Sequence, residues 1–234
     1  MLSAVETRSA DRRDVWLVVP AYNEAQRLDA TLRALCAAWP SIVVIDDGST
    51  DETARVALRH PVWLLSHLVN CGQGAALRTG VAFALAQAAE VVVTFDADGQ
   101  HDPADIPRLV DALREGADVA LGSRFLGSAP GMPRARRWLL AAAVLFTRLT
   151  TGVRVTDAHN GLRALSRRAA AQIRLVHSGM AHASEFVSEV RAHGLAVREV
   201  PVTVRYSAET LAKGQRSRSA LHVLLQLFTG WLIR

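Results

Sequence analysis

The sequence contains few cysteines and almost no lysine. Cys36 and Cys71 are the only cysteines among its 234 residues, and Lys213 is the single lysine among 27 basic residues. Two cysteines are too few for a disulfide framework, and these two stand in no spacing typical of metal ligands. We therefore expect a protein of a reducing compartment, the cytoplasm.

Aromatic residues and long hydrophobic runs are scarce as well. Aromatics make up 6% of the chain and do not alternate with basic residues as base-stacking surfaces require, so we expect no nucleic-acid partner. The net charge of +5 suits phosphate-bearing ligands or an anionic membrane surface instead. No apolar run reaches the ~20 residues of a membrane-spanning helix. The first 14 residues lack the apolar core of a signal peptide, and we predict that they are disordered.

Hydrophobic residues nevertheless make up 50% of the chain, which is enough for one large core. Short apolar runs alternate with helix-like stretches, and this predicts an α/β fold on a mostly parallel sheet flanked by helices. The predicted strands are 15–19, 42–45, 62–65, 91–95, 119–121 and 197–204, and the predicted helices are 25–38, 52–59, 74–89 and 103–115. We predict one domain over residues 15–217, followed by an amphipathic helix over residues 218–234.

Polar clusters follow each of the first five predicted strands. In order they read PAYNE (20–24), DDGSTD (46–51), NCGQG (70–74), DADGQHD (96–102) and GSR (122–124). Because the carboxyl ends of parallel strands share one edge of a sheet, we expect these clusters to form a ligand site there. The third cluster also begins a helix, whose first amides suit a phosphate group.

The fourth cluster contains two aspartates, Asp96 and Asp98, directly after a predicted strand. Alternate residues of extended backbone point the same way, so both carboxylates can face one cation. With the amide of Gln100 they make an oxygen site suited to Mg²⁺ or Mn²⁺. The other interpretation is a turn whose carboxylates cap the next helix. A calcium loop is excluded, because Gly99 stands at its fourth position and Pro107 at its twelfth.

Taken together, the motifs VVPAYNE (18–24), IDDGSTD (45–51), DADGQHDP (96–103) and GSR (122–124) resemble those of family 2 glycosyltransferases, which have the Rossmann-like GT-A fold. The chain is most similar to the branch of dolichyl-phosphate mannose synthases and bacterial polyprenyl-phosphate sugar synthases. The resemblance implies a metal-dependent, inverting transfer from a nucleotide-diphosphate sugar (GDP-mannose or a UDP-sugar) to a polyprenyl or dolichyl phosphate. The Q-x-x-R-W motif of processive synthases is absent from the sequence, which favours transfer of a single sugar.

The resemblance also implies roles for individual residues on the donor side. The base and ribose would be bound by Pro20, Tyr22, Glu24, Asp47 and the Ile45 backbone. The sugar-nucleotide would be contacted by Asp96, Ala97 and Asp98, with Asp98 and Gln100 as the main ligands of Mg²⁺ or Mn²⁺. Arg124 would meet phosphate or sugar, and with Asp96, Asp98 and Asp157 it forms our predicted catalytic set.

Further motifs resemble the family's acceptor side and its phosphate-contacting C-terminal loop. Residues 156–163 (TDAHNGLR) match the pattern D-x-x-x-G-x-R, which implies acceptor-side roles for Asp157, Asn160 and Arg163. The C-terminal loop departs from the family, because many relatives carry R-x-x-G-x-S-K and this chain has a KGQ. The candidates for contact with the diphosphate are therefore Arg205, Lys213 and Arg216.

Two basic and apolar stretches bear on a lipid acceptor. Arg134, Arg136 and Arg137 precede the apolar run 138–146, which offers cations for a phosphate and an apolar surface for a lipid. The alternative is a solvated basic turn before a core helix. The apolar run 221–233 is flanked by basic residues, and we predict that it lies on the inner face of a membrane without spanning it. Its alternative is packing against protein.

Two other functions remain open at this point. A transferase with a soluble or protein-bound hydroxyl acceptor would need a general base, for which Asp157 is the best candidate. A non-catalytic protein that binds a sugar-nucleotide is the second alternative. The intact set of Asp96, Asp98, Gln100 and Arg124 argues against it.

Overall fold

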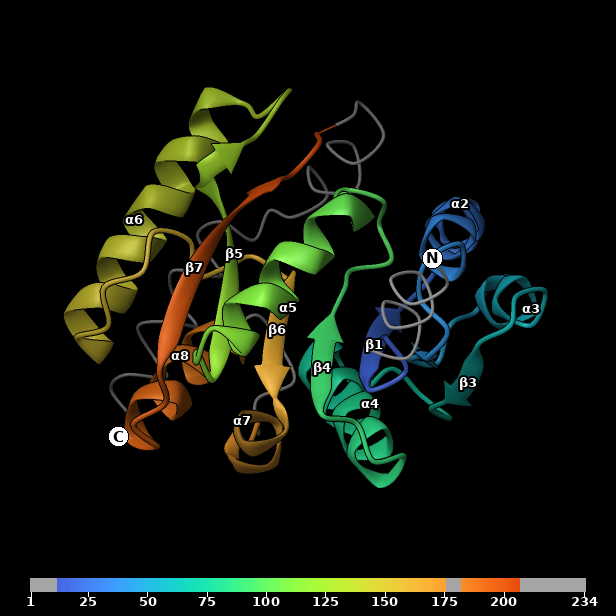
Figure 1. Cartoon of the computed structure of the whole chain (residues 1–234). Helices are drawn as coiled ribbons and strands as arrows, with labels where there is room; N and C mark the ends of the chain where they lie inside the picture. Colours follow the sequence, from blue (N-terminus) through green and yellow to red (C-terminus); the bar gives the residue numbers. More distant parts are fainter. Residues whose placement is uncertain (1–11, 176–181, 207–234) are drawn as a thin grey trace, which may run out of the picture.

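The computed structural model describes residues 12–175 and 182–206, and the elements named here lie within them (Figure 1). One sheet has the strand order β3-β2-β1-β4-β6-β5-β7. Its strands are β1 (Val15–Ala21), β2 (Ile42–Asp46), β3 (Trp63–Ser66), β4 (Val91–Thr94), β5 (Val119–Ser128), β6 (Arg163–Ser166) and β7 (Val197–Thr203). The helices are α2 (Ala25–Cys36), α3 (Thr53–Ala57), α4 (Gln73–Ala86), the 3-10 turn η1 (Pro103–Asp105), α5 (Ile106–Arg114), α6 (Arg134–Thr151), α7 (Arg167–Gln172) and α8 (His182–Ala192).

The sheet is buried on both faces, as its continuous apolar strands predict. In β1, Leu17 and Val19 point into the core beneath α2, α3 and α5. The alternate residues Trp16 and Val18 point into a second core beneath α4, α7 and α8. Side chains alternate between the two faces of a strand, so an unbroken apolar run can fill both cores. The predicted α/β fold with a mostly parallel sheet is therefore confirmed.

One strand was not predicted. β6 lies between β4 and β5 and runs antiparallel to both. It has only four residues and begins with an arginine, so its sequence does not have the apolar pattern of the other central strands. β4 and β5 are still parallel to each other, and their carboxyl ends reach the same edge as those of β1, β2 and β3.

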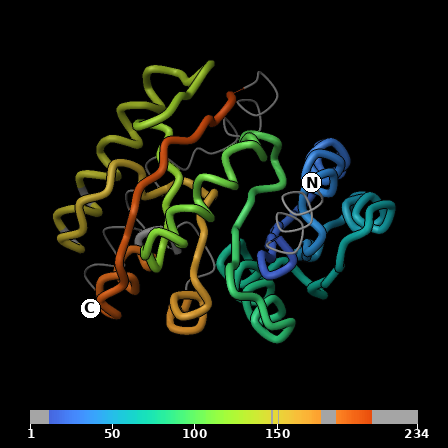
Figure 2. Tube along the Cα trace, in the orientation of Figure 1, coloured from blue at the N-terminus to red at the C-terminus, as the bar shows by residue number. Residues whose placement is uncertain are grey.

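β7 completes the sheet on the side of β5, and the two strands run in parallel although they are far apart in the sequence (Figure 2). After β5, the chain continues into α6, which begins at the carboxyl edge of the sheet and runs along the outside of the molecule (Figure 1). It ends at Gly152, whose φ of +69° is the left-handed conformation that suits glycine.

Two predicted segments lie wholly or mainly outside the described residues: the N-terminus (1–14), of which the structure describes 12–14, and the amphipathic helix 218–234. Among the described helices, none combines the length and the apolar character that crossing a bilayer demands.

Candidate active site

Most of the predicted donor-side residues come together at the carboxyl edge of the sheet. They line a cavity of about 470 Å³ between the ends of β1, β2 and β4 and the start of α4. Its walls are formed by Pro20, Ala21, Tyr22, Glu24, Asp47, Asn70, Gly72, Gln73, Ala76, Asp96, Ala97 and Asp98. Seven of the residues predicted from the sequence are in this wall, because parallel strands end together.

The loop after β1 is held against the loop after β2. Asn23 has a φ of +52°, its backbone N–H donates to Ser49 Oγ (2.9 Å), and its side-chain Oδ1 accepts from the N–H of Thr50 (2.9 Å). The N–H of Glu24 donates to Thr53 Oγ1 at 2.9 Å. These bonds fix the backbone after Tyr22, and the N–H of Asp47, which donates to the Ala21 carbonyl (2.9 Å), fixes it before Tyr22. The Tyr22 side chain lines the cavity and is 42% exposed.

Asp47 lines the cavity, but its carboxylate already has protein partners. Oδ2 accepts from the N–H of Gly72 (2.7 Å), and Oδ1 accepts from the N–H of Cys71 (2.9 Å) and contacts His67 Nδ1 (2.7 Å). Asp47 therefore holds the loop between β3 and α4 in place. Ile45 is fully buried in β2 beside α4, where a Cβ added at Gly80 would meet its Cδ1 at 2.6 Å.

Asp96 and Asp98 lie at the end of β4, on the floor of the cavity. Asp96 Oδ1 accepts from Gln73 Nε2 (3.0 Å), and its Oδ2 lies 3.3 Å from His101 Nε2. Asp98 Oδ1 accepts from the N–H of Gln100 (3.0 Å). Burial, followed by the nearby charge of Asp96, raises the pKa of Asp98 from 3.8 to about 6. Two carboxylates thus share a poorly solvated place that favours a positive charge.

Arg205 lies two residues after the end of β7, against the loop that follows Asp98. Its N–H donates to the carbonyl oxygen of Gln100 (2.8 Å), and its guanidinium pairs with Asp102 at 2.9 Å. The Arg205 side chain is therefore tied to the loop that follows Asp98 and is not among the residues that line the cavity. The other two candidates for contact with the diphosphate, Lys213 and Arg216, lie outside the described residues.

Arg124 is buried rather than directed into the donor cavity. Its Nε donates to Asp157 Oδ2 (2.6 Å), its Nη1 donates to the Tyr206 hydroxyl (2.5 Å), and its Nη2 donates to the His159 carbonyl (3.2 Å). Burial lowers the pKa of Arg124, but Asp157 and Tyr206 together outweigh it, and the net direction is upward. The ion pair ties the middle of β5, which continues to Ser128 beyond the predicted end at residue 121, to the predicted acceptor-side loop.

That loop is also held by Glu199 of β7 and by hydrogen bonds among its own residues. Glu199 Oε1 accepts from the N–H of Thr156 (2.7 Å) and from the N–H of Asp157 (3.2 Å). Asn160 is buried and its Oδ1 accepts from the N–H of Leu162 at 2.9 Å. Arg163, the first residue of β6, is buried too, and its Nε donates to the Asn160 carbonyl at 2.8 Å. Asp157, Asn160 and Arg163 thus belong to one loop that is held in place by buried and partly buried hydrogen bonds.

Buried charge extends from this loop to the carboxylate pair. Burial lowers the pKa of Arg163 to about 10, although the charges of Asp96 and Asp157 favour its charged form. The guanidinium carbon lies 4.3 Å from the centre of the Phe186 ring. Gly161 makes the approach to Asp96 close, because an added Cβ there would lie 1.9 Å from Asp96 Oδ2.

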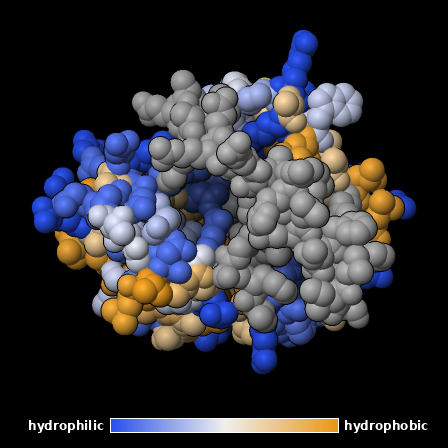
Figure 3. All heavy atoms as spheres, turned by 180° about the vertical axis from the view of Figure 1, so that it is seen from behind, coloured by the Kyte–Doolittle hydropathy of each residue, from blue (hydrophilic) through white to orange (hydrophobic). Residues whose placement is uncertain are grey.

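The arginines before the apolar run are on the first turn of α6. Arg134 and Arg137 are exposed, and Arg136 lies over the Tyr206 ring at 5.1 Å. Further along α6, large apolar side chains are exposed on one face at Trp138 (77%), Leu145 (57%) and Leu149 (78%). Hydrophobic atoms are visible at the right margin of Figure 3, where α6 forms the edge of the molecule. The expectation of a basic segment beside an apolar surface fits this helix.

Sequence reasoning missed several residues of the site. His101 is buried against Asp96 and packs edge-to-face on Phe95 with ring centres 5.7 Å apart. Asn70 lines the cavity from the loop before α4, and Gln73 lines it from the first residue of α4. The signal for all three was available, because they belong to the polar clusters after β3 and β4, but their contacts depend on the packing of separate strands.

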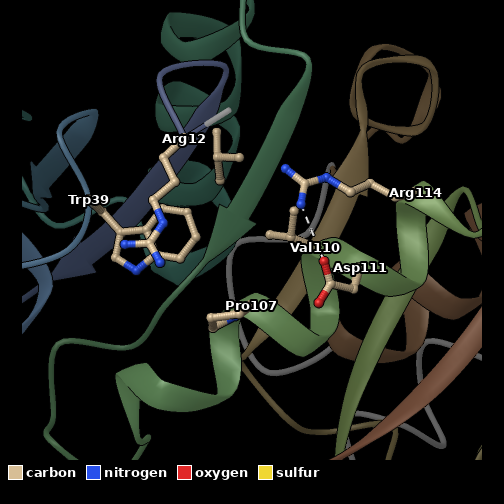
Figure 4. Close-up of a pocket in the computed structure, with 7 residues that line it drawn as sticks. Arg12, Trp39, Pro107, Val110, Asp111 and Arg114 are labelled. Carbon is tan, nitrogen blue, oxygen red and sulfur yellow. Dashed lines mark hydrogen bonds and ion pairs between the residues drawn. The ribbon is translucent and has the colours of Figure 1, made fainter. Parts of the chain in front are cut away.

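A second hollow, of about 480 Å³, lies on the opposite edge of the sheet and contains no predicted site residue (Figure 4). Its two arginines already have partners. Arg12 lies over the Trp39 ring at 5.0 Å, and Arg114 pairs with Asp111 at 3.3 Å. Nothing in this hollow points to catalysis.

The fold is that of a GT-A glycosyltransferase. Glucosyl-3-phosphoglycerate synthase from Mycobacterium tuberculosis, in a structure with Mn²⁺, UDP-glucose and phosphoglyceric acid, superposes with a TM-score of 0.68. The sequence identity is 21%, and the match covers 97% of this chain and 83% of that one. At this identity the likeness concerns the fold alone.

The chain belongs to glycosyl transferase family 2, whose model matches residues 16–174. The polyprenol monophosphomannose synthase of Mycolicibacterium smegmatis is 31% identical over 231 residues, covering 93% of this chain and 86% of that protein. The undecaprenyl-phosphate mannosyltransferase of Micrococcus luteus is 35% identical over 159 residues, covering 64% of this chain and 65% of that protein. The protein is therefore a glycosyltransferase, and the resemblance to polyprenyl-phosphate sugar synthases is confirmed.

Proposed function

We propose that this glycosyltransferase moves one sugar, with inversion, from a nucleotide-diphosphate sugar to a polyprenyl phosphate and requires Mg²⁺ or Mn²⁺. The observation that carries the proposal is the carboxylate pair Asp96 and Asp98 on the floor of the cavity, with the pKa of Asp98 raised to about 6. The names of the two relatives support the acceptor, since both describe mannosyl transfer involving a polyprenyl monophosphate.

The donor binds along the cavity wall in this proposal. Tyr22, half-exposed on a backbone that is fixed on both sides, offers a flat surface to the base. Pro20, Glu24 and Ala97 complete the wall around the base and sugar. Asp47 acts through the loop that it holds, because its carboxylate oxygens already accept hydrogen bonds from that loop.

The residues at the end of β4 fit a divalent cation. The donor set is two carboxylates and the amide of Gln100, which are oxygen ligands of the kind that Mg²⁺ and Mn²⁺ prefer. The burial and mutual repulsion that raise the pKa of Asp98 would be relieved by a positive charge. When bound, such a cation would offset the charge that develops on the departing diphosphate.

The acceptor side favours a phosphate over a hydroxyl group. A hydroxyl acceptor needs a general base, and Asp157 is buried and paired with Arg124 at 2.6 Å instead of lining the cavity. A polyprenyl phosphate is already an anion and attacks without a strong base. The exposed Arg134 and Arg137 suit its phosphate, and the exposed apolar face of α6 suits its chain.

The donor and the acceptor are tested together with the purified full-length protein. UDP- and GDP-sugars are supplied in turn with short-chain polyprenyl phosphate and Mn²⁺, and sugar-lipid formation is followed by chromatography. We expect transfer from one nucleotide class, and loss of transfer when a chelator is added. Transfer to a soluble hydroxyl acceptor in preference to the lipid phosphate would contradict the proposal.

A position at the membrane surface is also part of the proposal. Flotation with anionic liposomes should recover the wild type, and Leu149→Glu should lower the recovery because a charge is costly at the acyl boundary. Leu58→Glu is the matched control, since Leu58 is 70% exposed but lies at the end of α3. Equal recovery of both variants would contradict a membrane contact through α6.

A further inference from the structure

Three residues with metal-binding side chains meet beside the donor cavity. Asp47 follows β2, His67 follows β3, and Cys71 lies in the loop before α4. One carboxylate oxygen, one ring nitrogen and the sulfur all lie within 4.8 Å of one another. The chain brings these residues together only through the pairing of β2 with β3, which explains why the cysteine spacing in the sequence does not reveal the cluster.

The atoms behind this cluster are arranged as in a metal site. His67 Nε2 lies 2.9 Å from Thr79 Oγ1, which leaves Nδ1 on the side of Asp47 and Cys71. Asp47 Oδ2 accepts from the N–H of Gly72, which leaves Oδ1 on the same side. Metal-binding histidines and carboxylates commonly have their remaining polar atom held in this way, because it fixes the ligand's orientation.

We propose that Asp47, His67 and Cys71 bind a thiophilic divalent cation such as Zn²⁺, and that this cation hinders binding of the sugar-nucleotide. Thiolate, imidazole and carboxylate are the ligands that Zn²⁺ takes, with water in the fourth position. His67 binds the ion through Nδ1 as a neutral imidazole, with its one ring proton on Nε2, where it donates to Thr79 Oγ1. The thiol proton of Cys71 passes to solvent, and the thiolate and the carboxylate then balance the charge of the ion.

Binding of Zn²⁺ to these three residues requires only a small adjustment of their side chains. Asp47 Oδ1 and His67 Nδ1 are 2.7 Å apart, whereas two ligands of a tetrahedral Zn²⁺ at ~2.0–2.1 Å stand roughly 3.3 Å apart. Cys71 is exposed, so the ion can enter from solvent. Mg²⁺ and Mn²⁺ prefer oxygen ligands and should stay with Asp96 and Asp98.

The effect on the donor rests on the proposed function. Asp47 and Gly72 both line the donor cavity, and Asp47 holds the loop that contains Cys71. A cation at Oδ1 competes for the atom that now accepts the N–H of Cys71. We therefore expect the loop to shift and the affinity for the sugar-nucleotide to fall.

The test is a titration of the full-length, metal-stripped protein with Zn²⁺ against a chromophoric chelator. Cys71→Ser should weaken one zinc site by more than about 100-fold, and Thr79→Val should weaken it by about 10- to 100-fold. Cys36→Ser is the matched control and should bind as the wild type does. With Co²⁺, a thiolate-to-metal absorption band should appear in the wild type and in Cys36→Ser but not in Cys71→Ser.

The outcomes separate the site from its effect. Unchanged zinc affinity in Cys71→Ser overturns the site, and so does release of the zinc by excess Mg²⁺. A site that depends on Cys71 but leaves the affinity for UDP- and GDP-sugars unchanged overturns the inhibitory effect. If no sugar-nucleotide binds at any zinc concentration, the proposed function fails, while the zinc titration still decides the site.

Discussion

Replacing Asp98 by asparagine removes a buried charge and nearly preserves the size of the side chain. The amide oxygen of Asn can still accept the hydrogen bond that Gln100 donates at 3.0 Å. The pKa of Asp98 is raised from 3.8 to about 6 by burial and by the charge of Asp96, so the folded protein holds a proton that the unfolded chain has released. Stability therefore falls as the pH rises from about 4 to about 6, in total by roughly 3 kcal/mol.

Asp98→Asn should avoid this loss. Above pH 7, in a chelating buffer, we expect the variant to melt about 6–12 °C above the wild type, since 1 kcal/mol corresponds to ~2–4 °C in a chain of this size. Near pH 4 the two proteins should melt together, because Asp98 is then protonated. The measurement is thermal unfolding by circular dichroism from pH 4 to pH 8.

Asp102→Asn is the matched control with the opposite sign. The N–H of Ala104 and the guanidinium of Arg205 lower the pKa of Asp102, so its contribution is present above the unfolded pKa and is lost in acid. This variant should be less stable than the wild type at neutral pH. Parallel melting of the wild type and Asp98→Asn across the whole pH range would refute the pKa argument. Equal stabilisation of the wild type and Asp98→Asn by Mn²⁺ would refute a role for the Asp98 charge in metal binding.

Three further predictions concern the cavity and the predicted acceptor-side loop. Tyr22→Ala should raise the donor KM several-fold with a smaller change in kcat, while Tyr22→Phe should stay near the wild type; steady-state kinetics decide, and an unchanged KM would contradict base binding. Gly161→Ala should lower the transfer rate by up to about 100-fold with little change in Tm, because the new Cβ displaces the Asp96 carboxylate; a rate within about twofold of the wild type would refute this. Asp157→Asn should cost about 3–5 kcal/mol in urea unfolding, because it leaves the buried Arg124 without its carboxylate; a cost below about 1 kcal/mol would show that the pair is not essential.

The sequence by itself determined the class of fold and the edge where the site lies. Apolar strands alternate with helices, and the polarity of a parallel sheet puts every carboxyl end on one side. That rule is local to each strand, so it placed Tyr22, Asp96 and Asp98 in one cavity without any knowledge of their contacts. The motifs in this order also identified the family, and the match over residues 16–174 confirms it.

Only the tertiary structure decided which polar side chains pair with one another and are therefore not available to a substrate. Arg124 and Asp157 are 33 residues apart and form a buried pair, whereas the sequence suggested that Arg124 meets the substrate. β6 was missed because four residues beginning with a buried arginine carry no apolar pattern of their own. Cys71 reaches Asp47 and His67 only when β2 and β3 pair. Local spacing sets where a strand ends, but side-chain pairing depends on distances between segments that the chain brings together by packing its core.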